Sequence, residues 1–586
     1  MQLHNKIHRL GLAVSPRNEN ATQDKNVIDL WKVLSSALSS ATNNSQYPLL
    51  RSVVKSRTDR SRFCFVEVQG AADATIDSAR KPHRLRVYFT EQTTFQWLRE
   101  EIAQRCNIVP MYDTGEETEA TTAQVTARHS VDYNPTYQRF VLKQKSYAQQ
   151  FSHIYVSRLQ QLRDIVTVQV DAKNEDHVPV LSKIIDLKAD GQECVLIGTL
   201  LKILGDKPDI FKALTSESGV VPIEKIEKPL ATTEDELLLE DESGRVELVG
   251  DIDVPRMVTG VVLGVRGRVP RDGAGGQFHV DEIFLPSFPP QYSLPERAES
   301  EYVALVSGLA VGQNSDAQPL RNHVLVDYLA GRLGDDKEKE FVSKIVRTVV
   351  VGNMIASTGK GDIQVPIIKR KTVEELALDA EPLKNADELV STLAAAMCVD
   401  LMPGPFDPSN YTLPQQSFHP CLFPRSSHFK SFRCVTNPYE AQVGGVQLFG
   451  HSGQPLQSML QCTLPKGNSL EDEDGDASMA TEQDKDEQEQ ERALDYLEQS
   501  LEWRHAAPTA PDLLACFPMA NEDPFILENC PHVYFAGNQP RFSTRLVKGA
   551  KGQEVRLITV PSFSESSTIV LVDLKDLSCF PITIGA

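Results

Sequence analysis

The chain has 586 residues, of which 41% are hydrophobic and 24% charged, and its formal net charge is −20. This length is too great for one hydrophobic core and predicts two or three domains of an ordinary soluble protein. No apolar run is long enough to cross a bilayer, Met1–Pro16 contains no signal-peptide core, and so acidic a globule is not a strong duplex-DNA binder by itself.

Ten cysteines are scattered along the chain, and no Cys-x-x-Cys pair occurs. This spacing argues against a zinc ribbon, an iron–sulfur site and a disulfide scaffold. It favours buried or incidental thiols in a reducing compartment.

Residues 1–135 carry little periodic pattern. Asn26–Leu38 has the spacing of one short amphipathic helix, and Arg84–Glu101 fits a strand followed by a helix. The segments around them are polar and poor in large apolar residues. We therefore expect residues 1–135 to be largely disordered or a lineage-specific extension.

Residues 145–290 are predicted to form a leading helix and an OB-fold domain. Apolar side chains at helical spacing predict a helix over Tyr147–Val166. Short strands follow at Glu193–Leu200, in a hairpin over Leu237–Leu248, and at Val258–Arg268 and Phe278–Leu285. Such strands favour an OB-type barrel. Because the barrel is poor in aromatic and basic residues, a structural or protein-binding role is favoured over single-strand binding.

Residues 300–586 are predicted to form an α/β domain, so the fold class expected for the whole chain is α/β plus all-β. Apolar strands are predicted at Tyr302–Val306, Ile345–Val351 and Cys398–Met402. Helical patterns lie between them, one on a face that includes Leu320 and another starting at Asn385. In such a sheet, ligands bind at the loops that follow the carboxyl ends of the strands.

An acidic loop is expected at about residues 465–491, before a helix that carries Leu494, Leu497 and Leu501. Residues 471–491 hold eleven Asp or Glu residues and one Lys. So charged a tract is most simply a solvated, disordered loop. A switchable contact with a basic partner is the alternative.

The loop Leu401–Pro408 resembles the Gly-Asn-His-Asp loop of calcineurin-like metallophosphoesterases, which hold two cations at several strand ends. In this loop Pro405 and Phe406 stand at the metal-binding positions and only Asp407 is left of the motif. The degenerate positions are Gly308, Ala310, Asn353, Pro405, Phe406, Asn538 and Pro540. The resemblance therefore implies a metallophosphoesterase-like domain without metal, cofactor or catalytic residue.

Other candidate site residues are weaker. His451 lies near the position of a lone metal-binding histidine in this superfamily, but one residue out of register, which disfavours a ligand role. His419 and His505 are expected to be surface or packing residues. The basic residues 369–371 fit a solvated loop better than a nuclear-import signal. Serine-triad and P-loop patterns do not occur.

Longer motifs resemble the B-subunit family of DNA polymerases alpha, delta and epsilon, and they favour its delta branch. These are Met402–Pro408, Tyr411–Gln416, His419–Pro424, Thr436–Tyr439, Trp503–Asp512 and Gly537–Pro540. The resemblance runs from about Ser146 to the C-terminus. It implies a nuclear, non-catalytic accessory subunit that scaffolds the cysteine-rich C-terminal domain of the catalytic subunit and the third subunit during DNA replication and repair. It implies contact with DNA that is at most indirect or weak, and no contact with a membrane.

Four aromatic residues, Phe406, Tyr411, Phe418 and Phe423, are expected to form part of the partner surface. The alternative is that they fill the domain core. Two other functions stay open: an active metal-dependent phosphodiesterase or exonuclease with displaced ligands, and an OB protein that binds single-stranded DNA.

Overall fold

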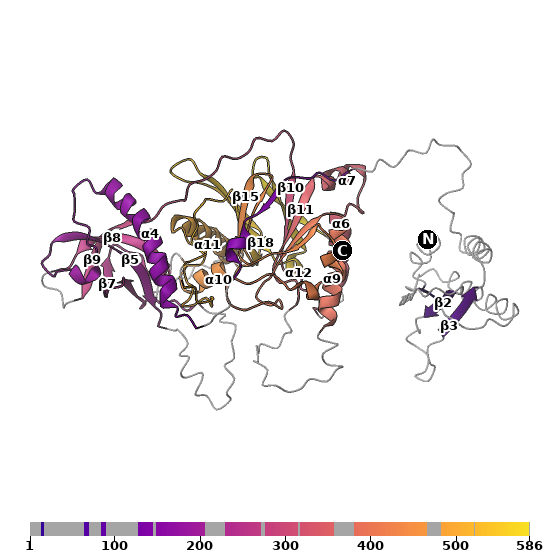
Figure 1. Ribbon diagram of the computed structural model, residues 1–586, viewed down its shortest axis with the longest axis horizontal. Coiled ribbons are helices and arrows are strands. Elements are labelled where there is room, and N and C mark those ends of the chain that lie inside the picture. The colour runs from indigo at the N-terminus through magenta and orange to yellow at the C-terminus, as the bar shows by residue number, and fades with distance from the viewer. Residues whose placement is uncertain are drawn as a thin grey trace, which may run out of the picture. The chain divides into compact units, whose positions relative to one another are not determined.

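The computed structural model describes residues 13–16, 64–69, 84–89, 127–143, 148–205, 229–270, 276–313, 317–356, 380–465, 482–520 and 522–584. The chain divides into two compact units, Met1–Gln124 and Val125–Ala586. The first contains an antiparallel sheet of β1 (Ala13–Pro16), β2 (Cys64–Gln69) and β3 (Arg84–Phe89), labelled in part in Figure 1. A strand therefore begins at Arg84 as predicted. The helix predicted at Asn26–Leu38 lies outside the described residues.

The second unit begins earlier than the predicted boundary at residue 135. Strand β4 (Tyr133–Pro135) pairs antiparallel with β14 (Tyr439–Val443). Arg128 donates hydrogen bonds to the carbonyl of Leu329 at 2.6 Å and to that of Ile345 at 2.7 Å. Residues 127–135, which the sequence pattern placed in the extension, are thus held by backbone and side-chain bonds to the second unit.

A closed five-stranded barrel lies where the short strands were predicted, with the order β5-β6-β7-β9-β8. Its strands are β5 (Glu193–Ile203), β6 (Glu236–Glu240), β7 (Arg245–Gly250), β8 (Val262–Arg268) and β9 (Gln277–Phe284). The β6–β7 turn forms because the Asp241 carboxylate accepts hydrogen bonds from the backbone N–H groups of Ser243 and Gly244, at 2.7 and 3.0 Å.

Helix α4 (Ser152–Lys173) packs on the barrel, as Figure 1 shows. It starts later and ends later than the predicted Tyr147–Val166, and Phe151, just before it, is exposed. Its buried face reaches Val166 and Val170. These two approach the barrel closely because Gly264 has no side chain; a Cβ there would lie 3.2 and 3.3 Å from them.

Two six-stranded sheets form the rest of the second unit. Sheet I has the order β13 (Phe432–Cys434), β12 (Cys398–Met402), β11 (Ile345–Val351), β10 (Tyr302–Val306), β19 (Thr568–Asp573) and β20 (Cys579–Thr583). Sheet II has the order β17 (Ser543–Lys548), β18 (Glu554–Pro561), β16 (Val533–Gln539), β15 (Val446–His451), β14 and β4. The three strands predicted for this region coincide with β10, β11 and β12.

The sheets pack face to face, with helices on their outer faces. Along β10, Val303 and Leu305 enter the core between the sheets, whereas Ala304 and Val306 face the helices, as the two-residue period of a strand requires. Sheet I is covered by α6 (Gln318–Leu329), α7 (Asp336–Ser343) and α9 (Glu381–Ala394). Sheet II is covered by α10 (Gln454–Gln461) and α11 (Glu482–Glu502). The shorter helices are α12 (Phe563–Ser566), η1 (Tyr137–Phe140), η2 (Ile184–Asp186), η3 (Val254–Arg256), η4 (Pro420–Leu422) and η5 (Ser426–His428). Among the described helices, none has the length and apolar composition to cross a membrane.

Three expectations about helices were wrong. Helix α9 begins at Glu381, so Asn385 lies inside it, and Leu320 of α6 is exposed instead of facing the core. Residues 482–491, expected as loop, are the first turns of α11. Because the later turns of α11 are fixed by packing, each additional upstream residue extends an existing helix at little cost.

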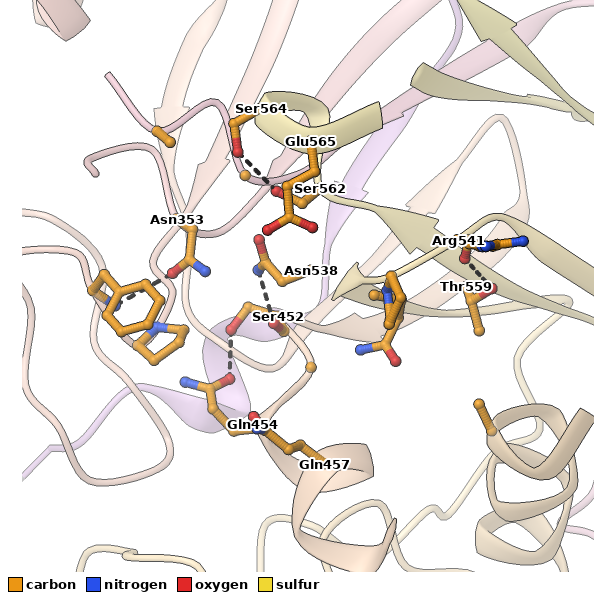
Figure 2. Close-up of a pocket in the computed structure, with 18 of the residues that line it drawn as sticks. Asn353, Ser452, Gln454, Gln457, Asn538, Arg541, Thr559, Ser562, Ser564 and Glu565 are labelled. Carbon is orange, nitrogen blue, oxygen red and sulfur yellow. Dashed lines mark hydrogen bonds between the residues drawn. The ribbon is translucent and has the colours of Figure 1, made fainter. Parts of the chain in front are cut away.

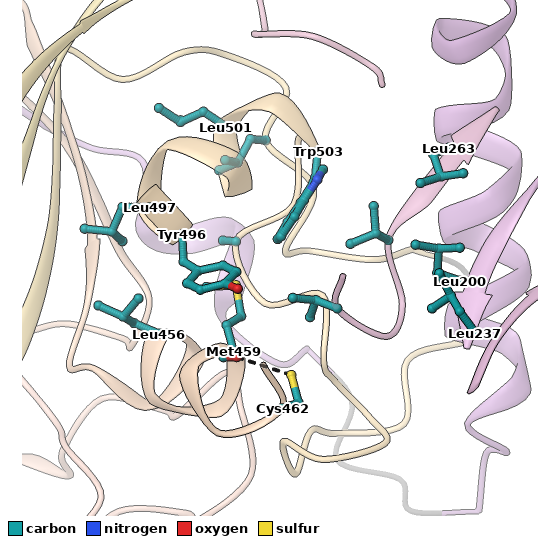
Figure 3. Close-up of a cluster of buried hydrophobic side chains, with 14 of the residues drawn as sticks. Leu200, Leu237, Leu263, Leu456, Met459, Cys462, Tyr496, Leu497, Leu501 and Trp503 are labelled. Atoms are coloured by element: carbon teal, nitrogen blue, oxygen red, sulfur yellow. Dashed lines mark hydrogen bonds between the residues drawn. The ribbon is translucent and has the colours of Figure 1, made fainter. Parts of the chain in front are cut away.

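One hydrophobic cluster joins the barrel to α10 and α11. In Figure 3, Trp503 packs beside Tyr496 of α11, near Met459 of α10, and Leu200 and Leu237 lie on the barrel side of the same cluster. Burial of these side chains stabilises the junction in proportion to the apolar area removed from water.

A buried arginine crosses the same junction. Arg158 of α4 has no exposed surface, and its Nε donates to Asp523 Oδ2 at 2.7 Å. Its two Nη atoms donate to the carbonyl oxygens of Gly260, Pro508 and Ala510 at 3.0, 2.9 and 2.8 Å. One side chain thus connects the leading helix, the barrel and the loops of the α/β part.

His505 completes this group, which we call the Arg158 network. Its Nε2 donates to Asp523 Oδ2 at 2.8 Å, and its Nδ1 accepts from the N–H of Ala507 at 3.2 Å. Burial lowers the pKa of His505 to about 4. Burial alone would raise the pKa of Asp523, but His505 and Arg158 hold it well below its usual range.

Replacing Arg158 by methionine should lower the free energy of unfolding by about 3–5 kcal/mol, because the Asp523 carboxylate is then buried without its cationic partner. The matched control is Arg163→Met on the same helix, whose exposed pair with Glu242 has a 3.5 Å separation. This change should cost less than about 1 kcal/mol. Urea denaturation followed by circular dichroism measures both, and equal losses in the two variants would contradict the role given to Arg158.

Candidate functional site

The carboxyl ends of the parallel strands of both sheets meet at one cleft of about 620 Å³. We call it the strand-end cleft, and Figure 2 shows the residues that line it. All seven positions that the sequence singled out as degenerate metal-ligand positions lie on its wall: Gly308, Ala310, Asn353, Pro405, Phe406, Asn538 and Pro540. The structure therefore brings together loops that are widely separated in the sequence, from Gly308 to Pro540.

The loop after β10 approaches the loops after β11 and β18. The N–H of Gly308 donates to the carbonyl of Gly352 at 3.0 Å, and that of Ala310 to the carbonyl of Asn353 at 3.1 Å. A Cβ on Gly308 would lie 2.3 Å from Ser562 Oγ, so only glycine fits. Ala310 and Asn353 have φ of 46° and 53°, a left-handed conformation that costs non-glycine residues about 1 kcal/mol or more.

Asp407, the acid that remains in the loop after β12, faces main-chain groups. Its two carboxylate oxygens accept hydrogen bonds from the N–H groups of Ile355 at 2.9 Å and Gly404 at 2.8 Å. Burial raises the pKa of Asp407 to about 6, although these bonds act in the opposite direction. Asn353 Oδ1 accepts from the N–H of Phe406 at 3.3 Å. Both side chains thus fix the shape of the loop.

Asn538, near the end of β16, connects the two sheets. Its Nδ2 donates to the carbonyl of Val351 in sheet I at 3.1 Å and to that of Ser452, after β15 of sheet II, at 2.9 Å. Its own N–H donates to Ser307 Oγ at 3.0 Å, and its φ is 55°. Because Nδ2 uses both hydrogens, the other side-chain atom must be the acceptor Oδ1, which is buried and has no partner among the described residues.

His451 lies under the cleft and is not part of its wall. Its Nδ1 accepts from the N–H of Gly453 at 3.1 Å, and its ring packs edge-on against Tyr534. Burial lowers the pKa of His451 to about 3. Among the described residues there is no group of three or more His, Cys, Asp or Glu side chains placed to hold a metal ion.

The four aromatic residues expected at a partner surface divide into two pairs. Phe406 and Tyr411 are 46% and 57% exposed. Phe418 and Phe423 are 2% and 0% exposed and pack edge to face in the core between sheet I and its helices. This burial corrects the expectation for Phe418 and Phe423, because a side chain inside its own core offers no surface to a partner.

Sequence inspection missed the side chains that line the cleft from sheet II and α11. These are Ser452, Gln454, Gln457, Glu489, Gln490, Arg541, Ser562, Ser564 and Glu565. One local signal was available, since Ser452 and Gln454 come directly after β15. In the structure Asn437 Nδ2 donates to Ser452 Oγ at 2.8 Å and to Gln454 Oε1 at 3.0 Å. Amide and hydroxyl groups dominate this set, and such groups donate and accept hydrogen bonds with neutral polar ligands.

Two family models match the chain. One describes the B-subunit of DNA polymerase alpha/epsilon and matches residues 303–544, and the other describes the OB-fold domain of the DNA polymerase delta subunit and matches residues 150–283. The second match agrees with the barrel predicted from the short strands and observed in the structure.

Relatives with similar sequences come from plants, animals and fungi. The chain is 37% identical to the DNA polymerase delta small subunit of Arabidopsis thaliana over 79% of this chain and 98% of the relative. It is 34% identical to DNA polymerase delta subunit 2 of Drosophila melanogaster, over 78% and 98%. It is 32% identical to the DNA polymerase delta small subunit of Saccharomyces cerevisiae, over 75% and 91%.

Gly404→Ala tests how tightly the loops at the cleft pack. A Cβ at this position would lie 2.4 Å from the backbone nitrogen of Asn353, so we expect a loss of about 1–3 kcal/mol in the free energy of unfolding. Gly244→Ala in the barrel hairpin is the control, since its Cβ would meet nothing within 4 Å. Urea denaturation midpoints compare the two, and an unchanged midpoint for Gly404→Ala would show that the loops are loose.

His451→Asn tests the buried imidazole, since Asn Oδ1 can accept the Gly453 hydrogen bond. The folded pKa of about 3 is below the unfolded value of 6.5, so His451 stabilises the fold above pH 6.5. Between pH 6.5 and pH 4 the unfolded chain takes up a proton that the folded chain does not, and this group should remove about 3 kcal/mol of stability. The variant should lose this part of the pH dependence.

His419→Asn is the matched control for that experiment. The exposed His419 accepts from the N–H of Cys421 at 3.2 Å, the same local bond that His451 makes. Its variant should follow the wild-type dependence of stability on pH, measured by urea denaturation from pH 7 to pH 4. An unaltered slope in His451→Asn would show that the imidazole is protonated in the fold.

Proposed function

Because the chain belongs to the family of DNA polymerase delta small subunits, we propose that it scaffolds the polymerase without catalysing a reaction itself. In this proposal it is a nuclear subunit that holds the cysteine-rich C-terminal domain of the catalytic subunit and the third subunit during DNA replication and repair synthesis. The observation that carries the proposal is the match of 32–37% identity over at least 91% of the relatives named above.

The α/β part is, in this proposal, a phosphoesterase-like scaffold that has lost its chemistry. Two facing sheets with loops gathered at their carboxyl ends support this assignment. Three of these loops keep a left-handed residue, namely Ala310, Asn353 and Asn538. Strained backbone of this kind concentrates at functional sites. The side chains at these positions are poor cation ligands, because Ala310 offers only a methyl group and the amides of Asn353 and Asn538 bond main-chain groups.

The loss of hydrolysis is proposed on the same grounds. A two-metal site needs carboxylates and imidazoles turned toward the cations. Asp407 turns its carboxylate toward the N–H groups of Ile355 and Gly404, and His451 lies beneath the wall. We therefore expect the purified chain to show no manganese-dependent cleavage of a phosphodiester; such cleavage, abolished by Asp407→Asn, would favour the phosphodiesterase alternative.

Single-strand binding by the barrel is less well supported. The aromatic side chains of the described barrel strands, Phe278 and Phe284, are buried and cannot stack on bases. Arg266 is engaged by Glu193 at 2.8 Å and Asp176 at 3.0 Å. Tight, salt-sensitive oligonucleotide binding by the chain alone would nevertheless establish that function.

We assign part of the partner surface to the segment that carries Phe406 and Tyr411. Both rings are substantially exposed, and prolines at 403, 405, 408 and 414 restrict the backbone between and around them. Exposed aromatic rings on a stiff segment bury apolar area on a partner with little loss of conformational entropy.

Co-expression with the C-terminal domain of the polymerase delta catalytic subunit, followed by affinity purification, tests the scaffold. Wild type should copurify in stoichiometric amount. Tyr411→Ala should weaken binding about tenfold or more, as the loss of one aromatic contact at the centre of an interface does. Tyr292→Ala is the control, because Tyr292 is 59% exposed and lies far from this segment in sequence.

Failure of the wild-type chain to copurify would reject the scaffold role. Equal weakening by Tyr411→Ala and Tyr292→Ala would reject the surface assignment and leave the scaffold role standing. Dissociation constants measured by biolayer interferometry quantify how much each variant weakens binding relative to the wild type.

A further inference from the structure

Apart from Phe406, the residues that line the strand-end cleft have no part in the scaffold role proposed above. Its volume of about 620 Å³ falls in the usual range of small-ligand pockets. Its charged lining residues are Glu489 of α11, Glu565 of α12 and Arg541. In Figure 2, Glu565 points toward Asn538 at the centre of the view, whereas the guanidinium of Arg541 extends away from both.

The wall below Glu565 is rich in hydrogen-bond acceptors. Asn538 Oδ1 has no donor among the described residues, because Nδ2 is the atom that bonds Val351 and Ser452. Ser562 Oγ lies near it, since a Cβ on Gly308 would meet both oxygens, at 2.3 and 3.1 Å, but this hydroxyl shares a hydrogen bond of 3.0 Å with Ser564 Oγ. An amide oxygen without a donor, close to the Glu565 carboxylate (Figure 2), creates a negative potential and favours a ligand that brings N–H groups and positive charge.

The carboxylates that face the cleft are available to such a ligand. The salt bridges of the neighbouring turns of α11 run from Glu491, Asp495 and Glu498 to Arg545. Within the described part of the chain, no salt bridge engages Glu489 or Glu565. Phe406 adds a partly exposed ring at the rim, on which an aliphatic stem or a guanidinium packs well.

We propose that the strand-end cleft binds an extended basic peptide of a partner protein. One lysine or arginine side chain enters between Glu565 and Glu489 with its stem against Phe406, and the amide of Gln457 bonds the peptide main chain. A nucleic-acid strand is a poorer occupant, because its phosphates would face two carboxylates and one arginine. This binding site goes beyond the scaffold role and does not depend on which subunit the chain holds.

The test uses the full chain alone and a fluorescein-labelled, terminally blocked pentapeptide with arginine at its centre and alanine elsewhere. Binding is measured by fluorescence anisotropy. The double variant Glu489→Gln/Glu565→Gln should weaken binding at least tenfold, and Phe406→Ala should weaken it severalfold. The control Glu234→Gln/Glu236→Gln changes the net charge by the same amount at exposed barrel positions and should stay within twofold of wild type.

A peptide with glutamate in place of arginine and a ten-residue oligothymidylate serve as competing probes. Neither should bind in the cleft. The proposal is overturned if the arginine peptide does not bind at millimolar concentration, if the two double variants weaken binding equally, or if the oligothymidylate binds more tightly than the peptide. Thermal melts of each variant establish that a loss of binding does not reflect unfolding.

Discussion

The placement of the barrel against the two sheets depends on the buried guanidinium of Arg158. Its planar array of N–H groups bonds one carboxylate and three carbonyl oxygens from three segments that are distant in sequence from its own helix. Lys202 makes a second buried connection, from the barrel to the carbonyl of Cys462 at the end of α10, at 2.9 Å. Cations taken out of water at a junction are costly unless every donor is satisfied, so these groups specify one arrangement of the domains.

The loops of the strand-end cleft are shaped by side chains that bond the main chain. Asp407, Asn353 and Asn538 are of types that coordinate cations in many proteins, but here they bond main-chain groups of neighbouring loops. The left-handed Asn353 and Asn538 are held by this same set of bonds. The loops at the cleft are thus fixed by hydrogen bonds within the chain.

Three histidines make the same local hydrogen bond and have different electrostatic roles. His419, His451 and His505 each accept from the backbone N–H two residues later. Only the surroundings differ: the first is exposed, the second is buried without a charged partner, and the third is buried against Asp523. Burial lowers the pKa of the last two, so both are held neutral in the fold.

Strands β10, β11 and β12, the barrel hairpin and the loops that meet at the cleft could be predicted from the order of the residues alone. Continuous apolar runs and turn residues are local signals, and motifs at strand ends converge because parallel strands end at one edge. Three features became clear only from the folded chain. Phe418 and Phe423 are buried while Phe406 and Tyr411 are exposed, and α11 extends into the acidic tract. Arg158 bonds Asp523, which is 365 positions away in the sequence. The exposure of a side chain and the pairing of charged side chains depend on contacts between distant segments, so a local sequence pattern does not predict them.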